Sequence, residues 1–187
     1  FPFNYKDNRP KRTSIRVGAT TVLNLATEFS EHEAIWFPHN MDWRGRVYPM
    51  VDGLSPQGNK LAKSLLSFAE GKRITDGAEN FLAIHIANEF GKDKLSLGDR
   101  VAWVFENEER IIDVANDPFG PNKNFWTTAD SPWGFLRGCL EWAGYCADPE
   151  GFLSTLPVAF DGSCSGLQHF SAMFKDEIGG REVNLVA

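Results

Sequence analysis

Apolar residues recur every three or four positions along most of the chain, a spacing that gathers them on one face of a helix. Helices are therefore predicted over residues 14–29, 60–70, 77–90, 97–116, 131–146 and 167–175. Gly71 and Gly91 directly follow two of these stretches and are expected to end them, because glycine readily adopts the left-handed backbone of a helix terminus. Ser96 and Ser131 stand where N-caps are expected.

Three short apolar stretches predict strands instead, over residues 34–38, 47–50 and 156–160. The first two enclose a polar loop, and the third ends at Asp161 before a glycine-rich turn leads into the last helix. Because helical stretches predominate, the expected fold class is α+β and mainly helical, with the strands carrying Asp42 and Asp161 toward one cleft. We expect one partial domain over residues 1–187, with a strand-loop-strand unit at 34–50 and a strand-turn-helix unit at 156–175.

The composition is that of a folded protein. A hydrophobic fraction of 42% over 187 residues is enough to build a core and excludes an intrinsically disordered chain. No apolar run approaches the roughly 18 residues needed to cross a bilayer, and the N-terminus lacks a signal-peptide pattern. We therefore expect a cytoplasmic protein with no membrane partner. Cys139, Cys146 and Cys164 show no metal-ligand spacing and are expected to be reduced thiols.

The net charge of −6 argues against a protein that binds nucleic acid by bulk attraction. The charge is uneven, however, since residues 1–63 carry nine basic and six acidic groups while residues 64–187 carry ten and nineteen. The densest basic stretch consists of Arg9, Lys11, Arg12 and Arg16. It could contact phosphate, or it could be a solvated basic turn.

The segment around Asp161 has the pattern of a candidate catalytic site. A carboxylate at the end of a strand suits Mg²⁺, and the amides at the start of the following helix suit phosphate. A turn-forming Asp beside Gly162 is the simpler interpretation. The spacing Gly162-x-Cys164-x-Gly166 also matches a nucleophile elbow, which would make Cys164 the nucleophile of a cysteine hydrolase that still needs a base and an orienting acid.

The loop from Asp42 to Arg46 is a second candidate site. Arg44 and Arg46 flank Gly45, so the two guanidinium groups could contact a phosphodiester backbone, and Trp43 offers a face on which a base could stack. The alternative is that an ion pair between Asp42 and Arg46 merely braces the turn. Spacing alone leaves both interpretations open.

Several motifs together closely resemble the single-subunit DNA-directed RNA polymerases of T-odd bacteriophages, mitochondria and chloroplasts. They lie at residues 35–48 (IWFPHNMDWRGRVY), 56–59 (PQGN), 130–132 (DSP) and 159–173 (AFDGSCSGLQHFSAM). The match runs from about residue 28 to residue 185 in the same order. Phe160 and the Ser171-Ala172-Met173 ending are more similar to the phage branch than to the mitochondrial one.

The resemblance implies a nucleotidyltransferase active in transcription, with this chain forming part of the palm of a right-hand polymerase with palm, fingers and thumb. By that resemblance Asp161 is catalytic and holds two Mg²⁺ ions, and the Gly162 carbonyl holds one of them. Gly166 would let the incoming nucleotide approach closely. The implied template and RNA–DNA hybrid contacts are Asp42, Trp43, Arg44, Gly45 and Arg46. The implied partners are a DNA template, nascent RNA, ribonucleoside triphosphates and the rest of the polymerase, in a phage-infected bacterial cell.

The chain also departs from the whole family pattern. The family's second catalytic Asp, in a His-Asp-Ser hairpin, and the Lys and Tyr of its fingers helix belong downstream of the position matching Ala187, and the promoter-recognising N-terminal domain has no counterpart here. We therefore expect a central part of a longer polymerase that makes no RNA in isolation. A non-catalytic nucleic-acid-binding module is the alternative function, and a cysteine hydrolase using Cys164 is a more distant one.

Overall fold

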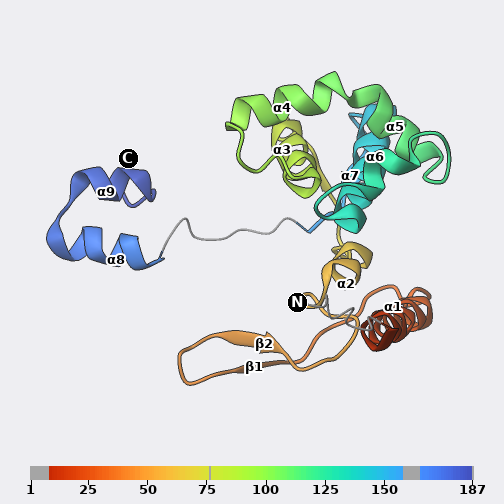
Figure 1. Cartoon of the computed structure of the whole chain (residues 1–187), viewed down its shortest axis with the longest axis horizontal. Helices are drawn as coiled ribbons and strands as arrows, with labels where there is room; N and C mark the ends of the chain where they lie inside the picture. The colour runs from red at the N-terminus through yellow and green to blue at the C-terminus, as the bar shows by residue number, and fades with distance from the viewer. Residues whose placement is uncertain (1–8, 76, 158–164, 187) are drawn as a thin grey trace, which may run out of the picture. The chain divides into compact units, whose positions relative to one another are not determined.

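The computed structural model describes residues 9–75, 77–157 and 165–186, and for residues 9–11 the backbone alone. The chain divides into two compact units, Phe1–Pro157 and Val158–Ala187. The element order is mainly helical, with short strands (Figure 1). This confirms the predicted mainly helical α+β class. In the part of the chain that the structure describes, no helix is both long and apolar enough to span a bilayer.

The larger core of the first unit is a cluster of helices in which α7 packs against α3, α5 and α6. Its members are α3 (Glu79–Phe90), α4 (Leu97–Glu106), α5 (Glu108–Asn116), α6 (Lys123–Thr127) and α7 (Pro132–Ala147). The core holds fully buried aliphatic side chains together with Phe135 and Trp142. Phe90 packs its ring 5.0 Å from Phe135 and 5.0 Å from Phe125, centroid to centroid. Burial of these aromatic rings adds to the stability that the aliphatic side chains supply.

Helix α7 approaches α3 closely because it has a glycine at the contact. A Cβ on Gly138 would lie 2.8 Å from Cγ1 of Ile86, which is fully buried. On the α5 side, the indole N–H of Trp142 donates to Glu108 Oε1 at 3.1 Å. Helix α7 thus packs closely against α3 at Gly138 and forms a side-chain hydrogen bond with α5 through Trp142.

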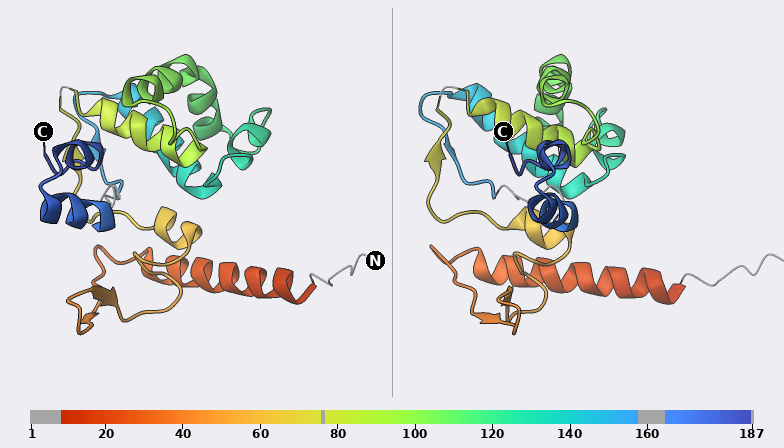
Figure 2. Two further views of the ribbon diagram at one scale, coloured as in Figure 1. Left: turned by 60° about the vertical axis from the view of Figure 1, so that its left-hand side comes forward. Right: turned by 90° about the vertical axis from the view of Figure 1, so that its left-hand side faces the viewer.

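A second, smaller core joins α1 (Arg9–Phe29) to α2 (Lys60–Leu65). Its buried residues are Val22, Leu54 and Ala62. The N-terminal half of α1 projects past this contact (Figure 2), and its side chains from residue 12 to residue 18 are exposed. Between α1 and α2, the strands β1 (His39–Met41) and β2 (Val47–Pro49) form an antiparallel hairpin. A second short antiparallel pair joins β3 (Lys72–Arg73) to β4 (Leu153–Ser154).

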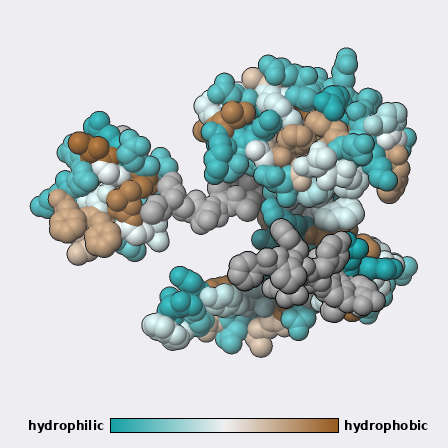
Figure 3. All heavy atoms as spheres, viewed as in Figure 1, coloured by the Kyte–Doolittle hydropathy of each residue, from teal (hydrophilic) through white to brown (hydrophobic). Residues whose placement is uncertain are grey.

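The second unit contains α8 (Ser165–Phe174) and α9 (Glu177–Glu182). Asp176 caps α9 through bonds from the N–H groups of Ile178 and Gly179, and Gln168 Nε2 donates to the Val183 carbonyl at 2.7 Å. Large apolar side chains remain exposed on this unit (Figure 3), namely Leu167, Phe170, Met173, Phe174 and Ile178. The unit therefore has more apolar surface than its two helices can bury.

Several sequence expectations hold in the structure. Helix α3 ends at Gly91 with a backbone φ of 106°, and Ser96 accepts the Asp99 N–H at the start of α4. Ser131 precedes α7 and Pro132 occupies its first turn, but the Ser131 side chain makes no capping bond.

The expected boundaries of several elements were wrong. Helix α1 begins at Arg9 rather than at Ser14. Residues 34–38 form no strand, because Ile35 and Phe37 instead line a cavity with α1 residues and strand pairing starts at His39. Helix α2 ends at Leu65 rather than near Gly71, since the Phe68 N–H bonds the distant Thr155 carbonyl at 2.9 Å.

The helix expected over residues 97–116 is divided at Asn107, where φ is −108° and ψ is 13°. The Trp103 carbonyl accepts both the Asn107 backbone N–H at 3.2 Å and its side-chain amide at 2.8 Å, and the same N–H also donates to the Val104 carbonyl at 3.1 Å. The strand expected at 156–160 is not found at Leu156 and Pro157, and residues 158–160 lie outside the described part. The pattern of apolar residues did not reveal the short helices α6 and α9 or the strands β3 and β4.

Replacing Gly138 by Ala should lower the free energy of unfolding by about 1–3 kcal/mol, because the added methyl group must displace the buried Ile86 side chain. Gly98→Ala on α4 is the matched control, since a Cβ there meets nothing within 4 Å. That control should raise stability by up to about 1 kcal/mol through helix propensity. Denaturant unfolding of the two variants measures both effects. A stabilised Gly138→Ala variant would contradict the close contact between α3 and α7.

Candidate functional site

The loop from Asp42 to Arg46 closes the β1–β2 hairpin, in which His39 pairs with Pro49 and Met41 with Val47. The Asp42 N–H donates to the Arg46 carbonyl at 2.9 Å, and the Gly45 N–H donates to the Asp42 carbonyl at 3.0 Å. Gly45 has a φ of 79°, which a residue with a Cβ adopts at a cost. The sequence correctly predicted a tight turn with a glycine at this position.

The Asp42 carboxylate organises the loop. Its Oδ1 accepts the backbone N–H groups of Arg44 at 2.9 Å and Arg46 at 3.0 Å. Its Oδ2 accepts Nε and Nη2 of Arg44, at 3.1 and 2.9 Å, and the Tyr48 hydroxyl at 3.4 Å. The backbone N–H of Arg46, followed by the Arg44 bonds, holds the pKa of Asp42 below its ordinary value. The loop therefore keeps this geometry while Asp42 is ionised.

The two arginines of the loop differ in whether their guanidinium groups are paired with a carboxylate. The Arg44 guanidinium forms an ion pair with Asp42 at 2.9 Å and lies 5.6 Å from the centre of the Trp43 ring. Arg46 is exposed, and no residue in the described ranges forms a hydrogen bond or ion pair with its guanidinium. The expected alternative of an Asp42–Arg46 ion pair was wrong, because the side-chain partner of Asp42 is Arg44 and the bond from Arg46 comes from its backbone.

The hairpin presents its side chains to solvent rather than to a core. Trp43 is 92% exposed, and both strands are exposed along nearly their whole length. Gln57 Nε2 donates to the Val47 carbonyl at 3.1 Å, which ties β2 to the following segment. Backbone and carboxylate hydrogen bonds, and not hydrophobic burial, therefore hold the hairpin. The result is a fixed loop that exposes both the Trp43 ring and the Arg46 side chain.

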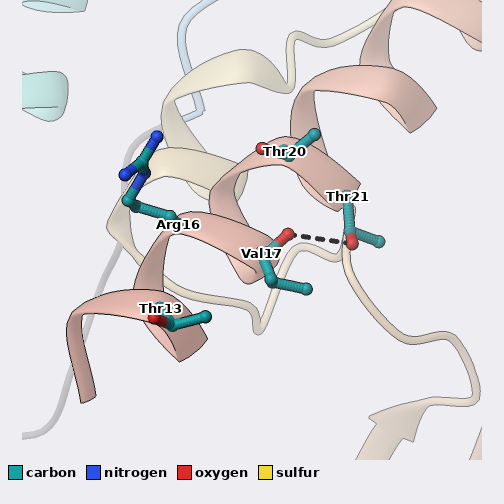
Figure 4. A pocket seen from close by; sticks show the side chains of 5 residues that line it. All are labelled: Thr13, Arg16, Val17, Thr20 and Thr21. Carbon is teal, nitrogen blue, oxygen red and sulfur yellow. Dashed lines mark hydrogen bonds between the residues drawn. The ribbon is translucent and has the colours of Figure 1, made fainter. Parts of the chain in front are cut away.

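Two cavities lie near this part of the chain. One, of about 310 Å³, is lined by Leu25, Phe29, Ile35, Trp36, Phe37, Val51, Asp52 and Leu54. The other, of about 380 Å³, is lined by Thr13, Arg16, Val17, Thr20 and Thr21 (Figure 4). All five lining residues of the second belong to α1, and the Thr21 hydroxyl donates to the Val17 carbonyl at 3.0 Å. It is a depression on one helix and brings no reactive groups together.

The candidate catalytic residues Asp161 and Gly162 lie outside the described residues, as does Cys164. On the far side of that segment, Gly166 lies in the first turn of α8, where a Cβ would meet nothing within 4 Å. Within residues 9–75, 77–157 and 165–186, the structure contains no group of three or more His, Cys, Asp or Glu side chains that could hold a metal ion. The described part therefore supplies no metal site by itself.

The two described cysteines are poor nucleophiles. Both are free thiols. Burial raises the pKa of Cys139 far above its ordinary value, and burial together with Glu108 raises the pKa of Cys146 to about 11. Both are therefore protonated at neutral pH.

The pattern of apolar residues did not reveal a polar cluster on α7. Glu141 is only 6% exposed, and Arg137, one helical turn earlier, lies 3.4 Å from its Oε2. Glu141 Oε1 accepts bonds from Ser154 Oγ at 2.6 Å, the Thr155 N–H at 2.9 Å and the Leu156 N–H at 3.3 Å. The available signal was an Arg and a Glu four residues apart within an otherwise apolar helix.

Comparison with known proteins places these residues in a family. The family model described as DNA-dependent RNA polymerase matches residues 72–187. T7 RNA polymerase of Escherichia phage T7 is 47% identical over 175 residues, which cover 94% of this chain and 20% of that protein. The DNA-directed RNA polymerase of Enterobacteria phage K11 is also 47% identical, over 94% of this chain and 19% of that protein.

A mitochondrial relative shows lower identity. The mitochondrial DNA-directed RNA polymerase of Mus musculus is 42% identical over 92% of this chain and 14% of its own length. The chain thus spans about a fifth or less of these relatives. The family match covers more than half of the chain and agrees with the resemblance of its motifs. The chain therefore belongs to the DNA-dependent RNA polymerase family.

Proposed function

We propose that this chain forms part of a phage-type DNA-directed RNA polymerase, which transfers ribonucleotides to an RNA 3′-hydroxyl under the direction of a DNA template. The observation that carries the proposal is its 47% identity to T7 RNA polymerase over 94% of its length. Since it spans 20% of that relative, the activity is assigned to a longer parent polymerase. The proposed partners are DNA, nascent RNA and ribonucleoside triphosphates, and the proposed setting is the cytoplasm of an infected bacterial cell.

The hairpin loop is proposed to contact the template and the RNA–DNA hybrid. Asp42 neutralises Arg44 and fixes the backbone of the loop, whereas Arg46 keeps its whole charge for a phosphate. The exposed ring of Trp43 offers a stacking surface beside that charge. Gly45 supplies the positive φ that lets the two arginines project from one short turn.

Asp161 and Gly162 are proposed to form the metal-binding end of the palm strand. A carboxylate and a backbone carbonyl are the hard oxygen ligands that Mg²⁺ prefers, so this donor set fits the ion. When bound, two Mg²⁺ ions supply charge neutralisation at the reacting phosphate and lower the pKa of the attacking hydroxyl. Gly166 is proposed to give the incoming nucleotide room. Its open surroundings in the second unit support this, because no packing within that unit requires a glycine there.

Replacing Arg46 by Ala in the parent polymerase should weaken template and hybrid binding and reduce the slope of log K against log salt concentration by about one. Arg44→Ala is the matched control, because the Arg44 guanidinium is already paired with Asp42 and should release less counterion. Binding titrations at several salt concentrations measure both slopes. An unchanged slope for Arg46→Ala would assign Arg46 to the turn alone.

Asp161→Asn should reduce RNA synthesis by the parent polymerase by about a hundredfold or more, since loss of even an outer partner of a metal ligand costs about 10- to 100-fold. Template binding should remain. Primer-extension rates and a DNA-binding measurement on the same preparation test this. Unchanged DNA binding by a wild-type parent that makes no RNA would support the non-catalytic module instead.

The isolated 187-residue chain should make no RNA from a primed template. Two Mg²⁺ ions about 4 Å apart need more than one carboxylate, and the family's second catalytic Asp belongs downstream of the position matching Ala187. Incubation with template, primer, nucleotides and Mg²⁺ tests this directly. Nucleotide addition that disappears with Asp161→Asn would show that the second carboxylate lies within this chain.

A further inference from the structure

We propose that Glu141 is a positioning residue for the polymerase reaction, because it anchors the chain segment that leads into Asp161. The inference rests on the proposed function. Glu141 does not contact the reacting atoms in this proposal. It acts by fixing Ser154, Thr155 and Leu156, and only four residues separate Leu156 from Asp161 in the sequence.

The anchor uses nearly every polar group of Thr155. Its N–H donates to Glu141 Oε1 at 2.9 Å, and its carbonyl accepts the Phe68 N–H at 2.9 Å. Its hydroxyl accepts Nη2 of Arg137 at 3.0 Å, and the same nitrogen donates to Ser67 Oγ at 2.9 Å. The next side chain, Leu156, is 9% exposed within the helical core. Helix α7 and the segment after α2 therefore both bond Thr155, and the helical core buries the residue that follows it.

Stability alone does not account for a carboxylate at this place. Removing a charge from water is costly, and apolar replacements of buried ion pairs often leave stability unchanged or increased. A single carboxylate oxygen that accepts two consecutive backbone N–H groups instead holds the backbone of Thr155 and Leu156 in one conformation. The polymerase would gain from this, because a displacement of about 1 Å at a reacting group can cost about a hundredfold in rate.

Glu108 provides a matched control on the opposite side of α7. Its Oε1 also accepts bonds from α7, from Trp142 Nε1 at 3.1 Å and from Cys146 Sγ at 3.6 Å. It is half-buried, and none of its bonds goes to residues 154–156. Glu108→Ala should therefore loosen the helical core without releasing the segment before Asp161.

The test compares Glu141→Ala, Glu141→Gln and Glu108→Ala in the full-length parent polymerase. Glu141→Ala should lower kcat about 10- to 100-fold with little change in the nucleotide KM, and should speed amide hydrogen exchange in residues 153–156. Glu141→Gln keeps a carbonyl acceptor and should restore both values to near wild type. Glu108→Ala should lower the unfolding temperature but leave kcat and that exchange unchanged.

Ser154→Ala covers the case in which Glu141→Ala does not fold. It removes the 2.6 Å bond to Glu141 and the longer 3.5 Å bond from the Leu156 N–H, and should lower kcat about fivefold. If Glu141→Ala folds and has the wild-type kcat, the positioning role is overturned. If Glu141→Ala does not fold, a wild-type kcat in Ser154→Ala overturns it. An equal loss of kcat in Glu108→Ala, or in Glu141→Gln, overturns it too. If the wild-type parent makes no RNA, the proposed function itself is overturned. This result distinguishes failure of the proposed function from failure of the positioning role, which requires an active wild-type parent.

Discussion

Packing around α7 is the constraint on which the larger core depends. Gly138 lacks a side chain, which lets α7 approach α3 closely, and the large side chains of Phe135 and Trp142 fill the core. The same helix also carries an ion pair between Arg137 and Glu141. These residues lie on different faces of one helix, so α7 can join α3 and α5 while its polar groups hold residues 154–156. Because buried side chains are close-packed, each of these faces accepts only residues of matching size and polarity.

The hairpin is stabilised by hydrogen bonds, in contrast to the hydrophobic packing of the helical core. It buries almost nothing, and the Asp42 carboxylate replaces a core by accepting bonds from two backbone N–H groups, one guanidinium and one hydroxyl. A loop built this way can expose Trp43 and Arg46 without losing its shape. The exposed side chains thus lie on a turn held by its own hydrogen bonds, and apolar burial is concentrated in the helices.

Much of the helical fold could be predicted, because α1, α3 and α7 carry long periodic stretches with clear ends such as Gly91 and Pro132. The errors came from interactions distant in sequence, which periodicity does not contain. The Phe68–Thr155 bond accompanies the early end of α2, and a non-helical backbone at Asn107 divides a helix whose apolar pattern continues through it. In the site, Gly45 predicted the turn. The choice of Arg44 over Arg46 as the partner of Asp42 depends on loop geometry, which the sequence leaves open.

An acidic chain can still offer a site for nucleic acid, because the relevant charge is local. At physiological ionic strength the field of an exposed charge is screened within about 8 Å. Acidic side chains of residues 64–187 that lie farther than this from the hairpin loop therefore act only weakly on a phosphate bound there. Within the loop, Asp42 cancels Arg44 and leaves one net positive charge on Arg46. A net charge of −6 limits nonspecific attraction to DNA, while one positioned guanidinium still favours a phosphate at a defined place. The overall acidity is therefore compatible with binding nucleic acid in a fixed register.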